Sequence, residues 1–186
     1  MTLILLLVLL SQQAADPAAK ASPTCELAGL VARPPAGWIN IQGDKPPAGH
    51  RGCQMVLLDK DGDPVGLMRL RSVAGPAPEF GAKTEAALIA TERGSLSQMN
   101  VKVGTQALWT RDPLPITDPF REARGAGYPA TIEGIPSEQE VHILTFRDDN
   151  ARYLISLVTA TRRQAPEAWQ RNTDDMGAVM RSFTRK

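Results

Sequence analysis

The sequence predicts an α+β fold, in which helices flank an antiparallel sheet, within a single domain over residues 22–186. Three observations predict this class. Segments in which apolar and polar residues alternate, as in half-buried strands, lie on both sides of a first helical pattern. A second helical pattern closes the chain. About 165 residues follow the N-terminal leader, which is the size of one domain with its own core.

The first part of the domain predicts a short strand and a hairpin. Residues 37–41, Gly-Trp-Ile-Asn-Ile, alternate in polarity after a proline pair at positions 34 and 35. The segments Cys53–Leu58 and Val65–Val73 resemble strands, and residues 59–64, Asp-Lys-Asp-Gly-Asp-Pro, form a concentrated turn signal between them.

A helix is predicted over residues 84–99, followed by an antiparallel meander. Thr84 is a plausible N-cap, and Ile89, Leu96 and Met99 fall on one stripe, although Gly94 weakens the helix by about 1 kcal/mol. Four strand-like segments follow, with a turn at residues 148–151 before the last. These segments are Val101–Trp109, Phe120–Tyr128, Glu140–Arg147 and Arg152–Thr161.

A C-terminal helix is predicted to begin at Pro166, a residue favoured in the first turn. Large side chains recur from there at three- and four-residue steps, which predicts a helix docked on the sheet. They are Trp169, Thr173, Met176, Met180 and Phe183.

With these elements in place, the chain resembles the Mog1/PsbP/DcrB-like group. The resemblance lies in Pro-Ala-Gly-Trp at residues 35–38, the late strand at residues 152–157 and the final helix from Trp169 to Phe183. It implies an αβα sandwich, and members of that group mostly act as binding or accessory proteins. Ran binding and photosystem assistance belong to other compartments, so the DcrB-like periplasmic proteins are the nearest analogy in location.

The N-terminus predicts export to the periplasm, with residues 1–21 forming a signal peptide and short leader. Residues 3–10 are apolar, a run of about 12 Å as a helix and far short of the ~20 residues needed to span a bilayer. Small residues at Ala14-Ala15 or Ala19-Lys20-Ala21 suit a signal peptidase, so cleavage is expected between positions 14 and 21. No Lys or Arg precedes the run, and a buried N-terminal helix is the alternative.

Cys25 and Cys53 are the two cysteines, and an even pair in an exported chain predicts a disulfide. A lipid anchor on Cys25 is a weaker alternative, because the preceding Ser-Pro-Thr is a poor lipobox. Zinc is weaker still, because His50 near Cys53 supplies too few ligands.

Charge and motifs indicate neither a nucleic-acid partner, nor an enzyme, nor a cofactor. The 21 basic and 20 acidic residues are mixed along the chain, without a basic stripe. The two histidines are His50 and His142, and alternation places His142 on the face of Leu144 and Phe146, which favours a structural role. Motifs of the common exported hydrolases are absent from the sequence.

The acidic residues Asp59, Asp61 and Asp63 raise the question of a Ca²⁺ site. They fail as an EF-hand loop, because Pro64 stands where the loop needs Gly and Leu70 where it needs Glu. A solvated hairpin turn explains the same residues without a metal, and a loose surface site is the alternative.

The candidate partner surface is a proline-stiffened segment and its neighbouring aromatics. Three prolines within residues 111–119 limit the conformational freedom that docking would remove, and Trp and Arg are common at binding hot spots. A stiff connection between strands is the alternative interpretation. The candidate residues are Trp38, Trp109, Arg111, Leu114 and Ile116.

These observations predict an exported, non-enzymatic periplasmic binding or accessory protein. Its expected partner is another protein, either an envelope component or a secreted toxin that it neutralises as an immunity protein. The alternative is a small-ligand or lipid carrier with Leu144, Phe146 and Val158 as lining, and an envelope hydrolase is a more distant one.

Overall fold

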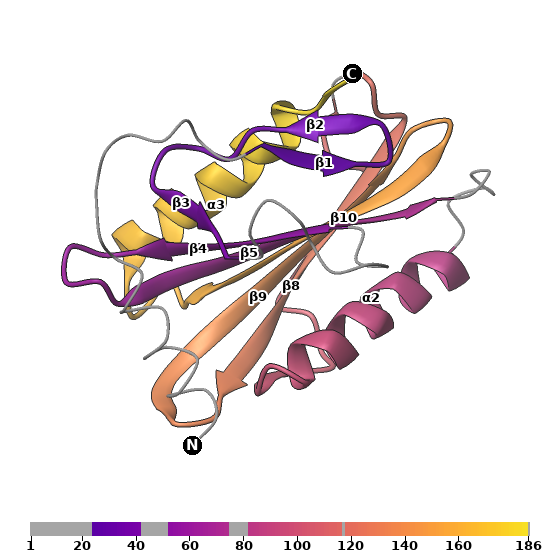
Figure 1. The fold of residues 1–186 in the computed structure, drawn as a ribbon. Coiled ribbons are helices and arrows are strands. Elements are labelled where there is room, and N and C mark those ends of the chain that lie inside the picture. Colours follow the sequence, from indigo (N-terminus) through magenta and orange to yellow (C-terminus); the bar gives the residue numbers. More distant parts are fainter. Residues whose placement is uncertain (1–23, 42–51, 75–81, 117, 186) are drawn as a thin grey trace.

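A computed structural model describes residues 24–41, 52–74, 82–116 and 118–185 (Figure 1). The predicted signal peptide and His50 lie outside these residues. The elements in chain order are β1 (Cys25–Leu27), β2 (Leu30–Ala32), β3 (Trp38–Asn40), β4 (Gly52–Leu58), β5 (Pro64–Ala74), α2 (Ala82–Ser97), β6 (Val101–Val103), β7 (Trp109–Arg111), β8 (Glu122–Ile132), β9 (Ile135–Arg147), β10 (Ala151–Ala160), α3 (Pro166–Arg181) and β11 (Thr184–Arg185).

The main sheet has eight strands in the order β3-β4-β5-β10-β9-β8-β6, and β7 also pairs with β8. Its pairings are antiparallel, which confirms the predicted sheet. The hairpin β4–β5 and the meander β8–β9–β10 form as expected. They join where β10 pairs with β5, with Ile155 opposite Leu70. The last strand of the meander therefore lies in the middle of the sheet.

The two helices cover opposite faces of this sheet, which confirms the α+β sandwich (Figure 1). Side chains of a strand alternate between faces. On β10, Tyr153, Ile155 and Leu157 therefore pack toward α3, whereas Leu154 and Val158 belong to the core on the α2 face. Because both faces are covered, β10 is buried along most of its length.

A second, three-stranded sheet of β1, β2 and β11 lies outside the sequence prediction. Ala28 and Gly29 both have positive φ angles, 45° and 86°, as the tight turn of a two-residue hairpin requires. These strands are too short for a periodic pattern to reveal. The predicted disulfide is present: Cys25 of β1 is bonded to Cys53 of β4, with their Cα atoms 5.9 Å apart. It ties the small sheet to the main sheet.

The single strand predicted over Val101–Trp109 is wrong, because the chain forms two short strands, β6 and β7. Both pair with β8, but residues 104–108 leave the ladder between them. They face Pro129 of β8, which has no N–H to donate. The amide of Gly104 still donates to the Pro129 carbonyl, at 2.7 Å, and that of Leu108 to the Gly127 carbonyl, at 2.8 Å. The pairing with β8 is therefore interrupted at Pro129, where the backbone N–H donor is missing.

Strand β9 also begins five residues earlier than predicted, at Ile135 and not at Glu140. Gly134, with a φ of 82°, lies in the tight turn that returns the chain from β8. The early residues of β9 are mostly polar, so the sequence pattern did not reveal them as part of a strand. The long arm of β8 and β9 that results extends beyond α3 and carries one wall of a cleft.

Candidate functional site

Trp38, the first of the predicted surface residues, lies in the core. Its side chain is 2 % exposed, and its indole nitrogen donates a hydrogen bond of 2.8 Å to Asp175 of α3. The ring therefore fixes α3 against the edge strand β3 and does not present itself to solvent.

Trp109 is half-buried at the opposite edge of the sheet. Its indole lies directly against Gly127 of β8, where any side chain would overlap the ring. It also meets His142 edge to face, with ring centroids 5.4 Å apart. Because Gly127 has no side chain, the tryptophan can lie flat on the sheet.

The proline-stiffened segment, residues 111–119, lies on the surface, and two of its side chains pack against the core. Arg111 is exposed, whereas Leu114 and Ile116 are half-buried and pack against the core under α3. The Leu114 amide donates to the Ala123 carbonyl at 2.8 Å, and the side chains of Leu114 and Trp109 both lie over Gly125. The structure thus brings Trp109 and Leu114 together and leaves Trp38 at the other edge.

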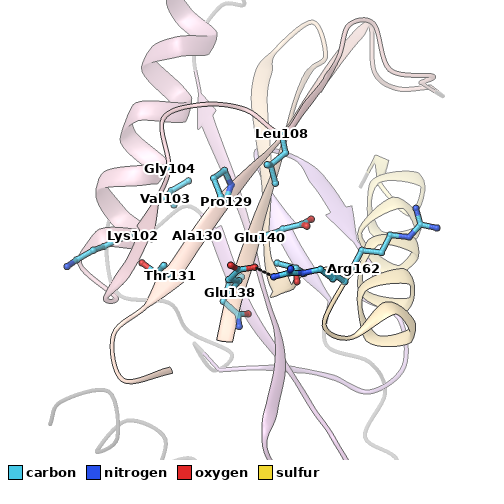
Figure 2. Close-up of a pocket in the computed structure, with 13 residues that line it drawn as sticks. Lys102, Val103, Gly104, Leu108, Pro129, Ala130, Thr131, Glu138, Glu140 and Arg162 are labelled. Atoms are coloured by element: carbon cyan, nitrogen blue, oxygen red, sulfur yellow. Dashed lines mark hydrogen bonds and ion pairs between the residues drawn. The ribbon is translucent and has the colours of Figure 1, made fainter. Parts of the chain in front are cut away.

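A cleft of about 970 Å³ opens at the outer part of the β8–β9 arm (Figure 2), and no described residue of the proline-stiffened segment lines it. One wall is the outer part of the β8–β9 arm, another is the chain between β6 and β7, and the third is the segment before α3. Its lining residues are Lys102, Val103, Gly104, Leu108, Pro129, Ala130, Thr131, Glu138, Gln139, Glu140, Thr161, Arg162 and Arg163.

Glu140 is held in place at the back of the cleft. Its Oε2 accepts two hydrogen bonds of 2.9 Å, from Nε2 of His142 and from the indole nitrogen of Trp169 on α3. His142 is 4 % exposed, and burial lowers its pKa although the hydrogen bond to Glu140 opposes that shift. The lowered pKa favours a neutral His142, whose Nε2 then donates to the carboxylate of Glu140 and orients it. The predicted burial of His142 is confirmed.

Cations and an exposed leucine complete the cleft. The guanidinium of Arg162 lies over the Trp169 ring, 5.3 Å from its centroid, and Arg163 pairs with Glu138 at 2.9 Å. Figure 2 shows Lys102 and Arg162 on opposite sides, with Glu140 between them. Leu108 is 56 % exposed, an unusual degree for a large apolar side chain. A cleft that combines charges of both signs with exposed apolar side chains suits noncovalent binding of a surface that also carries both polar and apolar groups.

The lining predicted for a lipid carrier is divided between two faces. Leu144 and Phe146 lie in the core under α3, whereas Val158 belongs to the core on the α2 face. These three residues therefore do not line one cavity.

The acidic hairpin residues serve the turn. Oδ1 of Asp59 accepts hydrogen bonds of 2.9 Å from the amides of Asp61 and Asp63, which confirms the turn interpretation. Within the described ranges, no group of three or more His, Cys, Asp or Glu side chains is arranged to hold a metal ion. In the same part of the chain, no helix has the length and apolar character needed to cross a membrane.

Sequence reasoning missed the residues that shape the cleft. Leu108, Glu140 and Arg162 lie far apart in the chain and belong to no motif. Leu108 could have indicated the cleft, because it is a large apolar residue within residues 104–108, which Pro129 keeps out of the sheet. Recognising it required the register of β8, which local patterns do not contain.

No protein-family model and no curated protein matches the sequence. Solved structures do match the fold. A mutant of Mog1 has a TM-score of 0.53 at 13 % identity, over 88 % of this chain and 95 % of that one. Mog1p of Saccharomyces cerevisiae has a TM-score of 0.53 at 12 % identity, over 84 % and 90 %. The PsbP protein of Synechocystis sp. PCC 6803 has a TM-score of 0.48 at 15 % identity, over 95 % and 99 %. From the two Mog1 structures, the chain has the Mog1/PsbP-like fold, as the resemblance in its sequence implies.

Proposed function

We propose that this protein is exported to the periplasm and acts there as a non-enzymatic binding protein whose partner is another protein. That partner is an envelope component or a secreted toxin, and in the second case the protein is an immunity protein. The observation that carries the proposal is the cleft beside α3.

The cleft supports recognition because its polar groups are already oriented. Glu140 is fixed by His142 and Trp169, and Arg162 is stacked on the same tryptophan. A side chain that is held before binding loses less conformational entropy when a partner arrives. Leu108 at the rim offers an apolar contact that a partner would remove from water.

Two further observations support the proposal. Mog1p of Saccharomyces cerevisiae is a Ran-binding protein, so a protein of this fold can recognise another protein. The disulfide between Cys25 and Cys53 suits an oxidising compartment such as the periplasm.

Affinity capture from envelope extract and from secreted proteins tests the proposal. The disulfide-formed protein should retain one stoichiometric partner, and Leu108→Asp should lose it because a carboxylate replaces the apolar contact. Ile39→Asp is the matched control, since Ile39 is a comparably exposed apolar side chain, at 49 %, on the opposite edge strand β3. It should retain the partner fully.

An empty eluate, or equal capture by both variants, would contradict the proposal. A captured protein that is toxic alone in the periplasm and harmless with this protein present would identify the immunity role. Fractionation and mass measurement of the mature chain would test export, with an N-terminus expected between positions 15 and 22.

A further inference from the structure

A second cleft, of about 310 Å³, opens on the face of the sheet that carries α2. It lies past the C-terminal end of that helix, over strands β4, β5, β10 and β9, and one side reaches the start of α3. Its lining residues are Ile41, Gln54, Val56, Pro64, Val65, Gly66, Leu67, Met99, Val101, Ile132, Ile135, Ser137, Gln139, Val158, Ala160, Ala165 and Ala168.

The chemistry of this lining is uniform and differs from that of the first cleft. Among the described residues that line it there is no Asp, Glu, Lys, Arg or His, whereas the first cleft has five charged side chains. Val56, Val101 and Val158 form a floor that is at most 5 % exposed. Half-buried Ile, Leu and Met side chains form the walls, and three alanines leave room beside α3.

The polar groups of the lining lie at its two ends. Gln54 belongs to β4, and Ser137 and Gln139 belong to β9, with β5 and β10 between them. Across the sheet, three strand spacings of together about 14 Å lie between the two ends, and along β9 Gln139 lies four positions from Ile143, the residue in register with Gln54. The intervening stretch is apolar, with Leu67 of β5 and Val158 of β10. An elongated ligand would thus find hydrogen-bonding side chains at its ends and aliphatic contacts along its length.

We propose that this cleft binds an uncharged acyl or alkyl chain with a neutral polar head. A charged ligand would lose its hydration without gaining a countercharge from the lining, which is unfavourable. The volume lies at the lower end of the range for small-ligand sites.

Calorimetric titration with n-octyl, n-decyl and n-dodecyl β-maltosides, each below its micelle concentration, tests the chemistry. Burial of each added methylene should tighten binding about threefold to fourfold until the cleft is filled. At pH 8, 1-decanol should bind at least tenfold more tightly than decanoate, whose carboxylate the lining does not neutralise.

A pair of variants tests the location. Ala168→Phe fills the cleft from α3 and should weaken dodecyl maltoside binding at least tenfold. Ala178→Phe makes the same change at a half-buried position of the same helix, outside the lining, and should leave binding unchanged. Circular dichroism should show both variants folded.

Absence of binding at any chain length, affinity that does not depend on chain length, or equal affinity of the Ala168→Phe variant would overturn the proposal. Self-association that Ala168→Phe abolishes would also overturn it, because the occupant would then be a second copy. The capture experiment on the other cleft depends on Leu108, so failure of one proposal leaves the other standing.

Discussion

At the scale of single residues, His142 shows how burial sets charge. Trp109 and Trp169 pack edge to face against its ring, with centroid distances of 5.4 and 5.7 Å, and a carboxylate oxygen of Glu140 accepts a hydrogen bond from its Nε2. Removal from water disfavours the imidazolium, and this effect outweighs the favourable interaction with Glu140. The folded protein therefore resists protonation of a residue that the unfolded chain protonates near pH 6.5.

The stability of the fold should consequently decrease as the pH falls below about 6.5. Because the pKa of His142 is lower in the folded protein, its contribution to the free energy of unfolding is complete above the pKa of the unfolded chain. That contribution is lost as the pH falls and the unfolded chain binds a proton that the folded protein does not. The free energy of unfolding, measured by urea denaturation from pH 7 to 5, should fall with pH in the wild type. Its slope against pH should be smaller in His142→Gln than in the wild type, by up to about 1.4 kcal/mol per pH unit. His50 is present in both proteins, so its contribution cancels. Identical slopes would contradict the assignment.

At the scale of elements, α2 is fixed to the sheet by a buried charge network. Glu92 is 1 % exposed and pairs with Arg69 at 3.0 Å and with Arg71 at 3.1 Å, both from β5. Its Oε1 also accepts a hydrogen bond of 2.7 Å from Ser156 of β10. Ser95, one turn further along α2, accepts hydrogen bonds from both arginines. The helix thus docks through ion pairs in addition to the apolar contacts of Leu96.

Removing this carboxylate should be costly, because Arg69 would be left buried without its countercharge. We expect Glu92→Ala to lower the free energy of unfolding by about 3 to 5 kcal/mol, measured by urea denaturation. Glu167→Ala, which removes an exposed carboxylate from the first turn of α3, should change it by less than about 0.5 kcal/mol. A loss below 1 kcal/mol in Glu92→Ala would show that the network does not hold the helix.

At the scale of the whole molecule, the disulfide joins two sheets that share no strand. It links β1 of the small sheet to β4 of the main sheet, and β11, which follows α3, completes the small sheet beside β2. The beginning and the end of the described domain therefore meet in one small sheet, which the disulfide and the buried side chains of Leu27 and Leu30 join to the main sheet. Figure 1 shows this small sheet beside the last part of the chain.

Replacing both cysteines by serine should lower stability by about 3 to 4 kcal/mol, because the 28-residue separation frees a large loop in the unfolded chain. Calorimetry should show a fall in Tm of about 10 °C. Adding dithiothreitol should bring the wild type to the same Tm and leave the double variant unchanged. A wild type that is insensitive to reduction would refute this role of the bridge.

The sequence by itself determined those features whose causes are local. Asp59 and the Gly and Asp residues after it form the hairpin turn through hydrogen bonds within five positions. Pro166 and the apolar steps after it form α3, and the two cysteines have only each other. With the order of the elements, these features were sufficient to predict the fold class.

Only the tertiary structure decided the features that depend on strand register. Pro129 divides a strand that lies more than twenty residues earlier in the chain, and Glu92 is buried because its partners come from β5 and β10. Leu108, Glu140 and Arg162 meet at one cleft for the same reason. Periodicity and turn signals act over a few residues, whereas these contacts arise when distant strands pair, so local patterns do not encode them.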